Sequence, residues 1–491
     1  MAGFKKGAFF SVSFGVVGKV FSFLSSLLLA FLFGSNIKAD IYFYLLLVTT
    51  LLNTWFYGIN FYLVVPEFIH RYQKNKKDAI DFANYFINLY TLIGLFIIIA
   101  TCLFPAPILS IISDFSKEQI NKGLFLVVLG SVHFVLFFIM SFFINLCESF
   151  QLFKIYFLAP LNTLLPLIIL FLTKNIEAMF IGYITAEIIQ ISICLYLLIT
   201  RAGWFYSFKK PKLSDKFKKD FWAMQPNSFI NMLLGYVPLW LISGMQAGLV
   251  SAMNYARMIS DSPSDVITMK VNNVARIKFA KEAAENKNEE LKESLFKTDR
   301  FLVFLLIPLS VFTSVFAKDI VEMLFMRGHF NLQDVSNTAF FLNFFILCVP
   351  FSALISNFIL LLSSLQLLKE TFLKYAGINL IFIICFIWGI KNYTPFSYPI
   401  ILLISVILTT AFNLFIAKKL LPFLNYTKHI LKIMGLLIVS LLLAFIIKTL
   451  NLYQGNIFIK IFINGITFVA LQLFLFYKLG FVKKIREDLN V

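Results

Sequence analysis

Long runs of apolar residues recur along the whole chain and are separated by short polar segments. Many of these runs are long enough for a helix to cross a hydrocarbon core of about 30 Å. The pattern is not the alternating ten-residue pattern of a membrane β-barrel. We therefore predict an all-α polytopic membrane protein with fourteen spans. They are residues 8–33, 40–66, 80–104, 123–146, 155–173, 177–200, 221–245, 248–272, 298–317, 335–363, 371–390, 396–417, 430–449 and 456–477.

The eighth predicted span, residues 248–272, is polar enough for hydropathy alone to favour a soluble loop. The distribution of lysine and arginine favours a crossing. With the N-terminus in the cytoplasm, predicted cytoplasmic segments hold 31 of these residues, outside loops hold 9, and three fall inside spans. If residues 248–272 formed a loop, the basic segment 276–300 would lie outside, against the positive-inside rule. We therefore predict that the stretch crosses and that both termini are cytoplasmic.

Composition agrees with this class of protein. The chain has 491 residues, of which 60% are hydrophobic and 14% are charged, whereas soluble domains are about a quarter charged. The net charge of +18 is explained by the basic cytoplasmic loops, so no nucleic-acid partner is expected. The apolar run near the N-terminus continues to Phe33 without a small-residue cleavage site, which favours a first span over a removable signal peptide.

The sequence contains no pattern typical of a metal site or of a catalytic nucleophile. The five cysteines are scattered without metal-ligand spacing, and the four histidines are dispersed. We predict a protein that is not an enzyme, has no cofactor and binds no metal. Coupling of its activity to the membrane potential or to a monovalent cation stays open.

Charged residues inside predicted spans are the strongest candidates for function, because each costs about 2.5–3.5 kcal/mol at a helix centre. Arg257 and Asp261 are four residues apart and share a helix face, which Asp265 continues. Pro263 between them favours a bend. The cluster is expected to face a water-filled interior. The alternative is a structural ion pair between helices.

Further polar positions lie inside predicted spans. Lys19 is in the first span and requires an anion or a carboxylate, for which Asp261 is one candidate. Asn53 in the second span is either a substrate contact or an interhelical packing residue. Glu187 in the sixth span either faces a cavity or pairs within its own bundle. Lys270 can extend toward the cytoplasmic interface and is a weaker candidate.

Four segments form distinctive motifs along the chain. They are FGSNIKAD (33–40) with the span that follows to VVPEF (64–68), NLCESFQLFKIYFLAPLNTLLP (145–166), GLVSAMNYARMISDSPS (248–264) and LFMRGHFNLQDVSNTAFFL (324–342). These segments resemble the MviN/MurJ-type lipid II flippases, which belong to the multidrug, oligosaccharidyl-lipid and polysaccharide exporter superfamily. The resemblance covers nearly the whole chain, and the loop with Arg-Gly is its most specific part.

The resemblance implies a multi-pass protein of the bacterial cytoplasmic (inner) membrane. It implies an N-lobe (1–210, spans 1–6), a C-lobe (211–425, spans 7–12), and two extra helices with a basic tail (426–491) that form a hydrophobic groove. The lobes would surround a central cavity. The implied substrate is an undecaprenyl-diphosphate-linked saccharide, such as the peptidoglycan precursor lipid II, moved by alternating access. Membrane lipids are the other expected partners, and we expect a monomer.

The cavity arginines of the family are only partly present. The first-span arginine aligns with Lys19 and a second one with Ser25, and the second-span pair falls around Asn53. The eighth-span arginine aligns with Met258, one residue after Arg257. These differences favour the broader substrate class, an anionic lipid-linked saccharide.

The candidate site residues follow from the charges and the resemblance together. The group expected to hold the diphosphate in the cavity is Lys19, Arg257, Asp261 and Asn53. The group expected to form a gate or an ion pair is Asp40, Asp265 and Arg327. No residue is assigned a catalytic role.

Three alternatives to lipid II transport stay open. The protein could flip an O-antigen or capsule lipid-linked oligosaccharide. It could be a cation-coupled multidrug exporter of the same superfamily, although that class predicts an acidic cavity and twelve spans. It could also be a membrane-embedded glycosyl- or acyltransferase with Asp40 as the acid, although no external loop is large enough to cover an acceptor.

Overall fold

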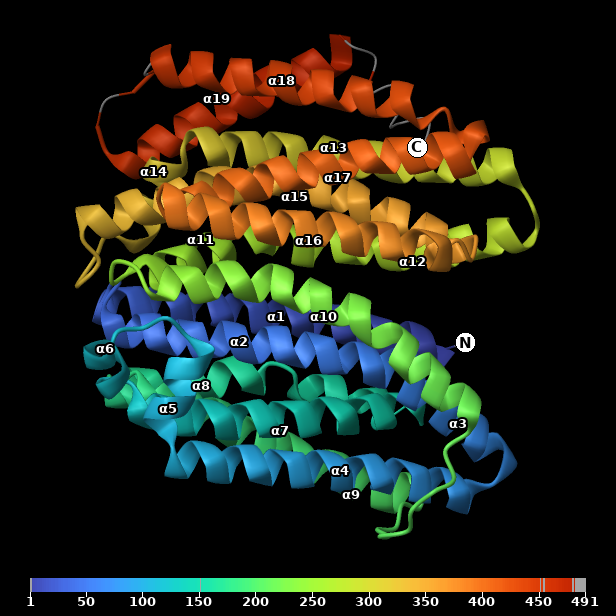
Figure 1. Ribbon diagram of the computed structural model, residues 1–491. Coiled ribbons are helices and arrows are strands. Elements are labelled where there is room, and N and C mark those ends of the chain that lie inside the picture. Colours follow the sequence, from blue (N-terminus) through green and yellow to red (C-terminus); the bar gives the residue numbers. More distant parts are fainter. Residues whose placement is uncertain (1, 151, 451, 454, 479–480, 482–491) are drawn as a thin grey trace. The chain divides into compact units, whose positions relative to one another are not determined.

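The computed structural model describes residues 2–150, 152–450, 452–453, 455–478 and 481, and within these it contains helices and no strands. The predicted all-α fold is confirmed. Contacts divide the chain into two compact units, Met1–Ser251 and Ala252–Val491. Long helices lie alongside one another within each unit (Figure 1).

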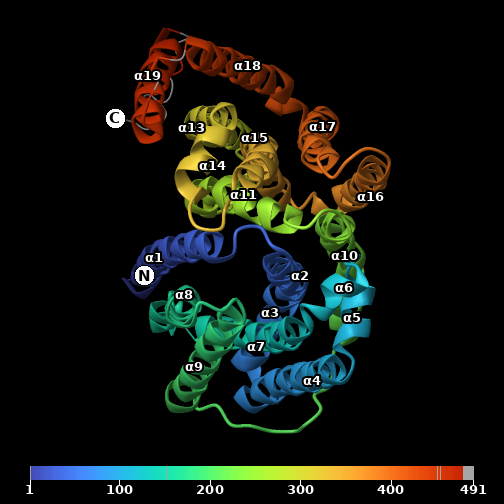
Figure 2. The ribbon, with the colours of Figure 1, turned by 90° about the vertical axis from the view of Figure 1, so that its left-hand side faces the viewer.

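The first unit is organised around α7 (Leu124–Ser149), which contacts α2, α4 and α9 (Figure 2). Large aromatic side chains such as Phe68, Phe82 and Phe142 are fully buried in its core. Its other helices are α1 (Ala2–Phe33), α2 (Ile37–Ile59), η1 (Asn60–Val64), α3 (Val65–Lys74), α4 (Lys76–Leu103), α5 (Pro105–Ile112), α6 (Lys117–Asn121), η2 (Phe153–Leu158), α8 (Leu161–Thr173), α9 (Glu177–Ala202) and α10 (Asp215–Ser243).

The second unit is organised around α15 (Leu332–Ser364), which contacts α12, α13, α14 and α17. Helix α11 (Leu249–Pro263) begins at the end of the first unit and continues into the second. The remaining helices are η3 (Ser264–Thr268), α12 (Met269–Ala284), α13 (Asn288–Val315), α14 (Ala317–Phe325), α16 (Leu368–Asn392), α17 (Ser397–Leu420), η4 (Pro422–Leu424), α18 (Tyr426–Leu450) and α19 (Ile457–Lys478).

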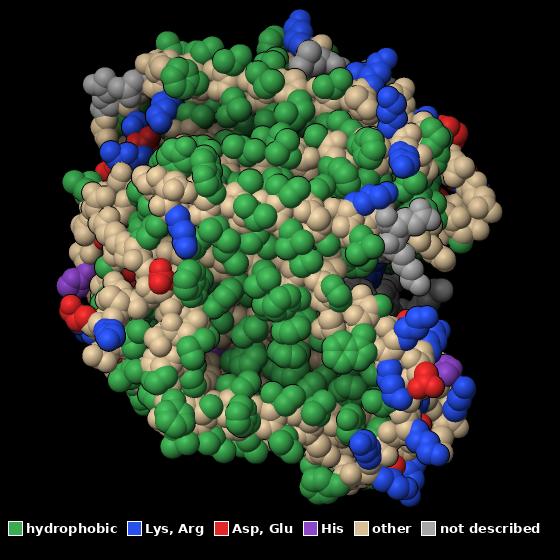
Figure 3. Space-filling view, in the orientation of Figure 1, with side chains coloured by type: hydrophobic (Ala, Val, Ile, Leu, Met, Phe, Trp, Pro, Cys, Tyr) green, Lys and Arg blue, Asp and Glu red, His purple; other side chains and the backbone are tan. Residues whose placement is uncertain are grey.

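The surface fits a membrane environment. Apolar side chains such as Leu92 and Phe96 on α4 are 70% exposed. Figure 3 shows hydrophobic side chains along the middle of the helices, with lysine and arginine gathered near helix ends such as that around α3. Among the described residues, 11 helices are long and apolar enough to span, or up to 12 if the bent pair α13–α14 is one span. The multi-pass prediction is confirmed. The count of fourteen and the cytoplasmic termini stay predictions, as do the three predicted domain boundaries.

Two helices extend beyond the predicted spans. Helix α2 continues through the π-helix η1 into α3 and ends only at Lys74. The connection 273–297, whose charges of alternating sign predict an exposed helix, consists largely of the end of α12 and the start of α13, joined at residues 285–287. Charged residues stop a hydropathy window but do not stop a helix, because lysine and glutamate have high helix propensity.

Helices α8 and α9 approach closely at Gly182, where a Cβ would overlap the Cα of Pro166 and lie 2.6 Å from its backbone nitrogen. Backbone atoms cannot move aside as a flexible side chain can. Replacing Gly182 with valine is therefore expected to destabilise the first unit by about 1–3 kcal/mol, the usual cost of overpacking. Thermal unfolding of the purified protein in detergent measures this. The control is Gly15→Val, because no atom lies within 4 Å of a Cβ at Gly15.

Candidate functional site

Asp40 lies in the first turn of α2, is 2% exposed, and binds the start of α11. One carboxylate oxygen accepts hydrogen bonds from the backbone N–H of Ser251 at 2.7 Å and from its hydroxyl at 2.6 Å. The other accepts from the backbone N–H of Gly248. A carboxylate at a helix N-terminus satisfies donors that have no partner in the helix and is favoured by the helix dipole.

Gly248 allows this contact. Its φ is +94°, and a Cβ there would lie 2.7 Å from the carbonyl oxygen of Ser35. Any other residue would be strained at this φ and would push the chain away from α2. The structure thus gives Asp40 a helix-capping role within the first unit. Its predicted role in a gate or ion pair stays a prediction.

Replacing Asp40 with alanine is expected to lower the free energy of unfolding by about 2–5 kcal/mol. Two backbone N–H groups and one hydroxyl would lose their acceptor in a buried place, at about 1–3 kcal/mol for each unsatisfied group. Thermal or denaturant unfolding in detergent measures the change. Asp215→Ala is the matched control, because that side chain is 99% exposed at the start of α10, and a change above about 0.5 kcal/mol there would contradict the argument.

Arg257 lies on α11 and is held from two sides within the second unit. Its Nη2 donates to the hydroxyl of Tyr398 at 2.7 Å, and its guanidinium carbon lies 5.6 Å from the ring centroid of Phe345. A cation over an aromatic face is attracted by the ring quadrupole. These contacts fix the orientation of the guanidinium, which remains able to donate further hydrogen bonds.

The acidic residues of the same segment lie one and two turns further along. Asp261 is exposed and accepts a hydrogen bond from the hydroxyl of Ser260 at 3.2 Å. Asp265 lies in the π-helix η3, which begins directly after Pro263. A π-helical turn thus follows Pro263, and the bend expected there stays a prediction. The chain stays helical from Leu249 to Ala284.

The remaining predicted site residues are distributed over both units. In the first unit, Lys19 is exposed on α1, and Asn53 on α2 is buried and donates to the carbonyl of Thr49 at 3.0 Å. In the second unit, Arg327 lies exposed just after α14 and donates to the carbonyl of Met323 at 3.3 Å. The contacts of Asn53 and Arg327 are local, so their predicted roles stay predictions.

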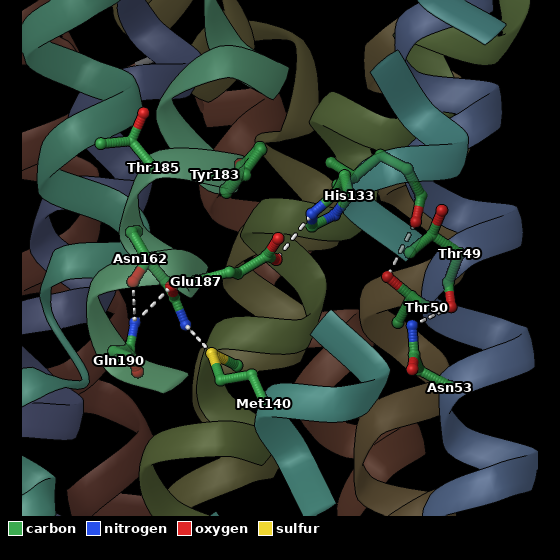
Figure 4. Close-up of polar contacts among 12 residues, drawn as sticks. Thr49, Thr50, Asn53, His133, Met140, Asn162, Tyr183, Thr185, Glu187 and Gln190 are labelled. Carbon is green, nitrogen blue, oxygen red and sulfur yellow. Dashed lines mark hydrogen bonds and ion pairs between the residues drawn. The ribbon is translucent and has the colours of Figure 1, made fainter. Parts of the chain in front are cut away.

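The first unit contains a buried pair that decides between the two alternatives for Glu187, a cavity residue or a partner within its own bundle. His133 on α7 and Glu187 on α9 lie 2.7 Å apart between Nδ1 and Oε1. Their side chains are 5% and 1% exposed, and Figure 4 shows the carboxyl group of Glu187 directed at the imidazole. The ring of Tyr183 stacks on His133 at 4.8 Å. Glu187 therefore pairs within its own bundle, and a separation of 54 residues gave no sequence signal for it.

A second polar chain lies beside this pair in Figure 4. Gln190, one turn after Glu187, donates to the amide oxygen of Asn162 on α8 at 2.6 Å. Asn162 contacts the sulfur of Met140 on α7 at 3.7 Å. Amides between spanning helices stabilise their association. The polar side chains around Glu187 thus join α7, α8 and α9.

Chemically, the predicted residues supply the cations of Lys19, Arg257 and Arg327, the carboxylates of Asp40, Asp261 and Asp265, and the amide of Asn53. The guanidinium of Arg257 is oriented by Tyr398 and Phe345, and its charge is permanent. Within the described ranges, no group of three or more histidine, cysteine or acidic side chains is arranged to hold a metal ion. Binding of a phosphorylated ligand by these residues stays a prediction.

Comparisons with known proteins identify the family of the chain. The model of the family "Lipid II flippase MurJ" matches residues 29–472. The probable lipid II flippase MurJ of Borreliella burgdorferi is 23% identical over 386 residues, 76% of either chain. That of Aquifex aeolicus is 22% identical over 450 residues, covering 87% of this chain and 86% of its own.

Solved structures show the same fold. A lipid II flippase MurJ in an inward closed conformation matches with a TM-score of 0.80 and 20% identity, over 95% of this chain and 99% of its own. An inward-facing multidrug transporter of the MATE family matches with a TM-score of 0.66 and 11% identity, over 86% and 99%. The match of the family model over most of the sequence decides between these two groups, and the chain belongs to the lipid II flippase MurJ family.

Proposed function

We propose that this protein moves lipid II, an undecaprenyl-diphosphate-linked saccharide, from the inner to the outer leaflet of the bacterial cytoplasmic membrane. The match of the flippase family model over residues 29–472 carries the proposal. The apolar spanning helices and the oriented cation Arg257 support it. The protein acts as a transporter, and no residue forms a covalent bond with the substrate.

The diphosphate is held by Lys19 and Arg257. Asn53 is a further donor, and the carboxylate of Asp261 holds the cations in position. Arginine forms two parallel hydrogen bonds to a phosphate, whereas lysine acts as a point charge. Transport proceeds by alternating access, in which the lobes rock around a fixed site. The membrane potential contributes about 2.3 kcal/mol per charge per 100 mV, enough to bias the return of the empty carrier.

A second candidate substrate is an O-antigen or capsule lipid-linked oligosaccharide. The observation that favours it is the partial loss of the family's cavity arginines, since Lys19 and Met258 stand where arginines are expected. The diphosphate and the polyprenyl chain are common to both substrates. The choice between them therefore depends on the saccharide.

A flipping assay in proteoliposomes tests the proposal. The purified protein is reconstituted in three separate preparations: one with fluorescent lipid II, one with an O-antigen-type lipid precursor, and one with a cationic dye and no lipid precursor. We expect lipid II to be flipped faster than the other precursor, and we expect no efflux of the dye. Preference for the O-antigen-type precursor selects the second candidate, and dye efflux without lipid movement would contradict both.

A further inference from the structure

The second unit contains a pocket between α13 and α18, with a cavity volume of about 610 Å³. Four basic side chains line it: Lys292 and Arg300 from α13, and Lys428 and Lys432 from α18. Among the residues that the structure describes, no acidic side chain lines it. The pocket is thus a concave basic site, separate from the residues assigned to the diphosphate.

Two acids of the described residues lie near the lining cations. Lys292 lies 3.0 Å from Glu289, but the carboxyl group of Glu289 is 78% exposed, and such a surface pair contributes little. Asp299, which precedes Arg300 on α13, is fully buried and accepts hydrogen bonds from Asn357 at 2.6 Å and Tyr426 at 3.2 Å. It also lies 3.3 Å from His429. Lys428 and Lys432 therefore present their charges to the pocket rather than to Asp299.

The lining changes from basic to apolar along α18. Lys428 and Lys432 lie in its first two turns and, four residues apart, share a face. Leu436 and Val439 line the pocket further along the helix. From residue 428 to 439 the rise is about 16 Å. The lining is therefore basic near the end of the spanning helix and apolar toward the hydrocarbon core. A membrane lipid has the same order, with a polar headgroup at the surface and acyl chains in the core.

Gly435 keeps the apolar part of the pocket open. It lines the pocket, and no atom lies within 4 Å of a Cβ built on it. A glycine inside a helix costs about 0.5–1 kcal/mol relative to alanine. No neighbouring helix in the described part of the chain packs against Gly435 closely enough to require a glycine. Its lack of a side chain instead leaves space at the pocket wall.

We propose that this pocket binds an anionic phospholipid of the surrounding membrane. The headgroup phosphate pairs with Lys428 and Lys432, and one acyl chain lies along Leu436 and Val439. Basic pockets between spanning helices are known to recognise anionic headgroups. The apolar wall explains why a lipid fits better than free phosphate. The bound lipid bridges α13 and α18 and stabilises the second unit.

The test uses the purified full-length protein in neutral detergent, with its thermal unfolding followed as phosphatidylglycerol is added. Phosphatidylglycerol is expected to raise the melting temperature, and phosphatidylcholine and inorganic phosphate are not. The double variant Lys428→Gln, Lys432→Gln is expected to need at least about tenfold more phosphatidylglycerol for the same shift, as loss of two charge-assisted contacts predicts. Gly435→Leu, which fills the apolar part, is expected to weaken the response without any change of charge.

The matched control is Lys418→Gln, Lys419→Gln, which removes two exposed lysines at the end of α17, outside the pocket. It is expected to respond as the unmodified protein does. An unchanged response of the Lys428 and Lys432 variant would overturn the proposal, as would an equal loss in the control. Inorganic phosphate giving the full shift would exclude a lipid. Displacement of phosphatidylglycerol by equimolar undecaprenyl diphosphate would make the pocket part of the substrate path instead.

Discussion

Replacing His133 with leucine is expected to lower the free energy of unfolding by about 3 kcal/mol, the upper end of the usual cost of leaving a buried polar group without its hydrogen-bond partner. Glu187 would remain 1% exposed and would lose the hydrogen bond of one carboxyl oxygen. Its other oxygen has no hydrogen-bond partner in the structure. The group would then either stay charged in an apolar core or take up a proton, and both states are less favourable than the pair. Denaturant unfolding in mixed micelles measures the change.

The double variant His133→Leu, Glu187→Leu separates the pair from its surroundings. Replacing a whole buried pair by apolar side chains is often neutral or stabilising by about 1–4 kcal/mol. We therefore expect the double variant to be more stable than His133→Leu alone. A double variant as unstable as the single one would show that packing around Tyr183 and Phe180, rather than the unpaired carboxyl group, dominates the loss.

Replacing Arg257 with alanine is expected to abolish complementation of a flippase-depleted strain and to slow lipid II flipping at least about tenfold. A hydrogen bond to a charged group contributes about 1.5–3 kcal/mol, and 1.4 kcal/mol is a factor of ten. Lys19→Ala is expected to have the same effect. Protein levels in the membrane, measured in parallel, separate loss of transport from loss of folding.

Two further variants sharpen the role of Arg257. Tyr398→Phe removes the hydroxyl that accepts its hydrogen bond at 2.7 Å but keeps the charge, so a smaller decrease in flipping is expected. Lys318→Ala removes an exposed cation on α14 and is expected to transport normally. Full complementation by either Arg257→Ala or Lys19→Ala would exclude that residue from diphosphate binding.

Much of the fold could be predicted because each spanning helix must satisfy its own backbone hydrogen bonds and present an apolar surface to lipid. Hydropathy records that surface directly, and α15 lies within three residues of its predicted bounds at either end. It does not record where a helix ends outside the membrane. This explains why the second predicted span ends at residue 66 although the helix continues through α3 to Lys74.

The candidate site was less predictable because its geometry depends on tertiary contacts. The position of Arg257 in a polar span was evident from the sequence, but its partners Tyr398 and Phe345 lie far along the chain. Asp40 was assigned to a gate or an ion pair, yet it accepts hydrogen bonds from the backbone N–H groups of Gly248 and Ser251 and from the hydroxyl of Ser251. Backbone N–H groups carry no residue-type signal. The one available clue was that α11 begins after Gly248 without a capping side chain of its own at that position.

The π-helical turns η1 and η3 have a consequence for the helices that contain them. In each, a hydrogen bond joins residues five apart, from Val65 to Asn60 and from Met269 to Ser264. Such a turn holds one residue more than an α-helical turn. One residue of an α-helix corresponds to a rotation of roughly 100°. The side chains that follow η3 therefore point in directions about 100° away from those that an uninterrupted α-helix would give them.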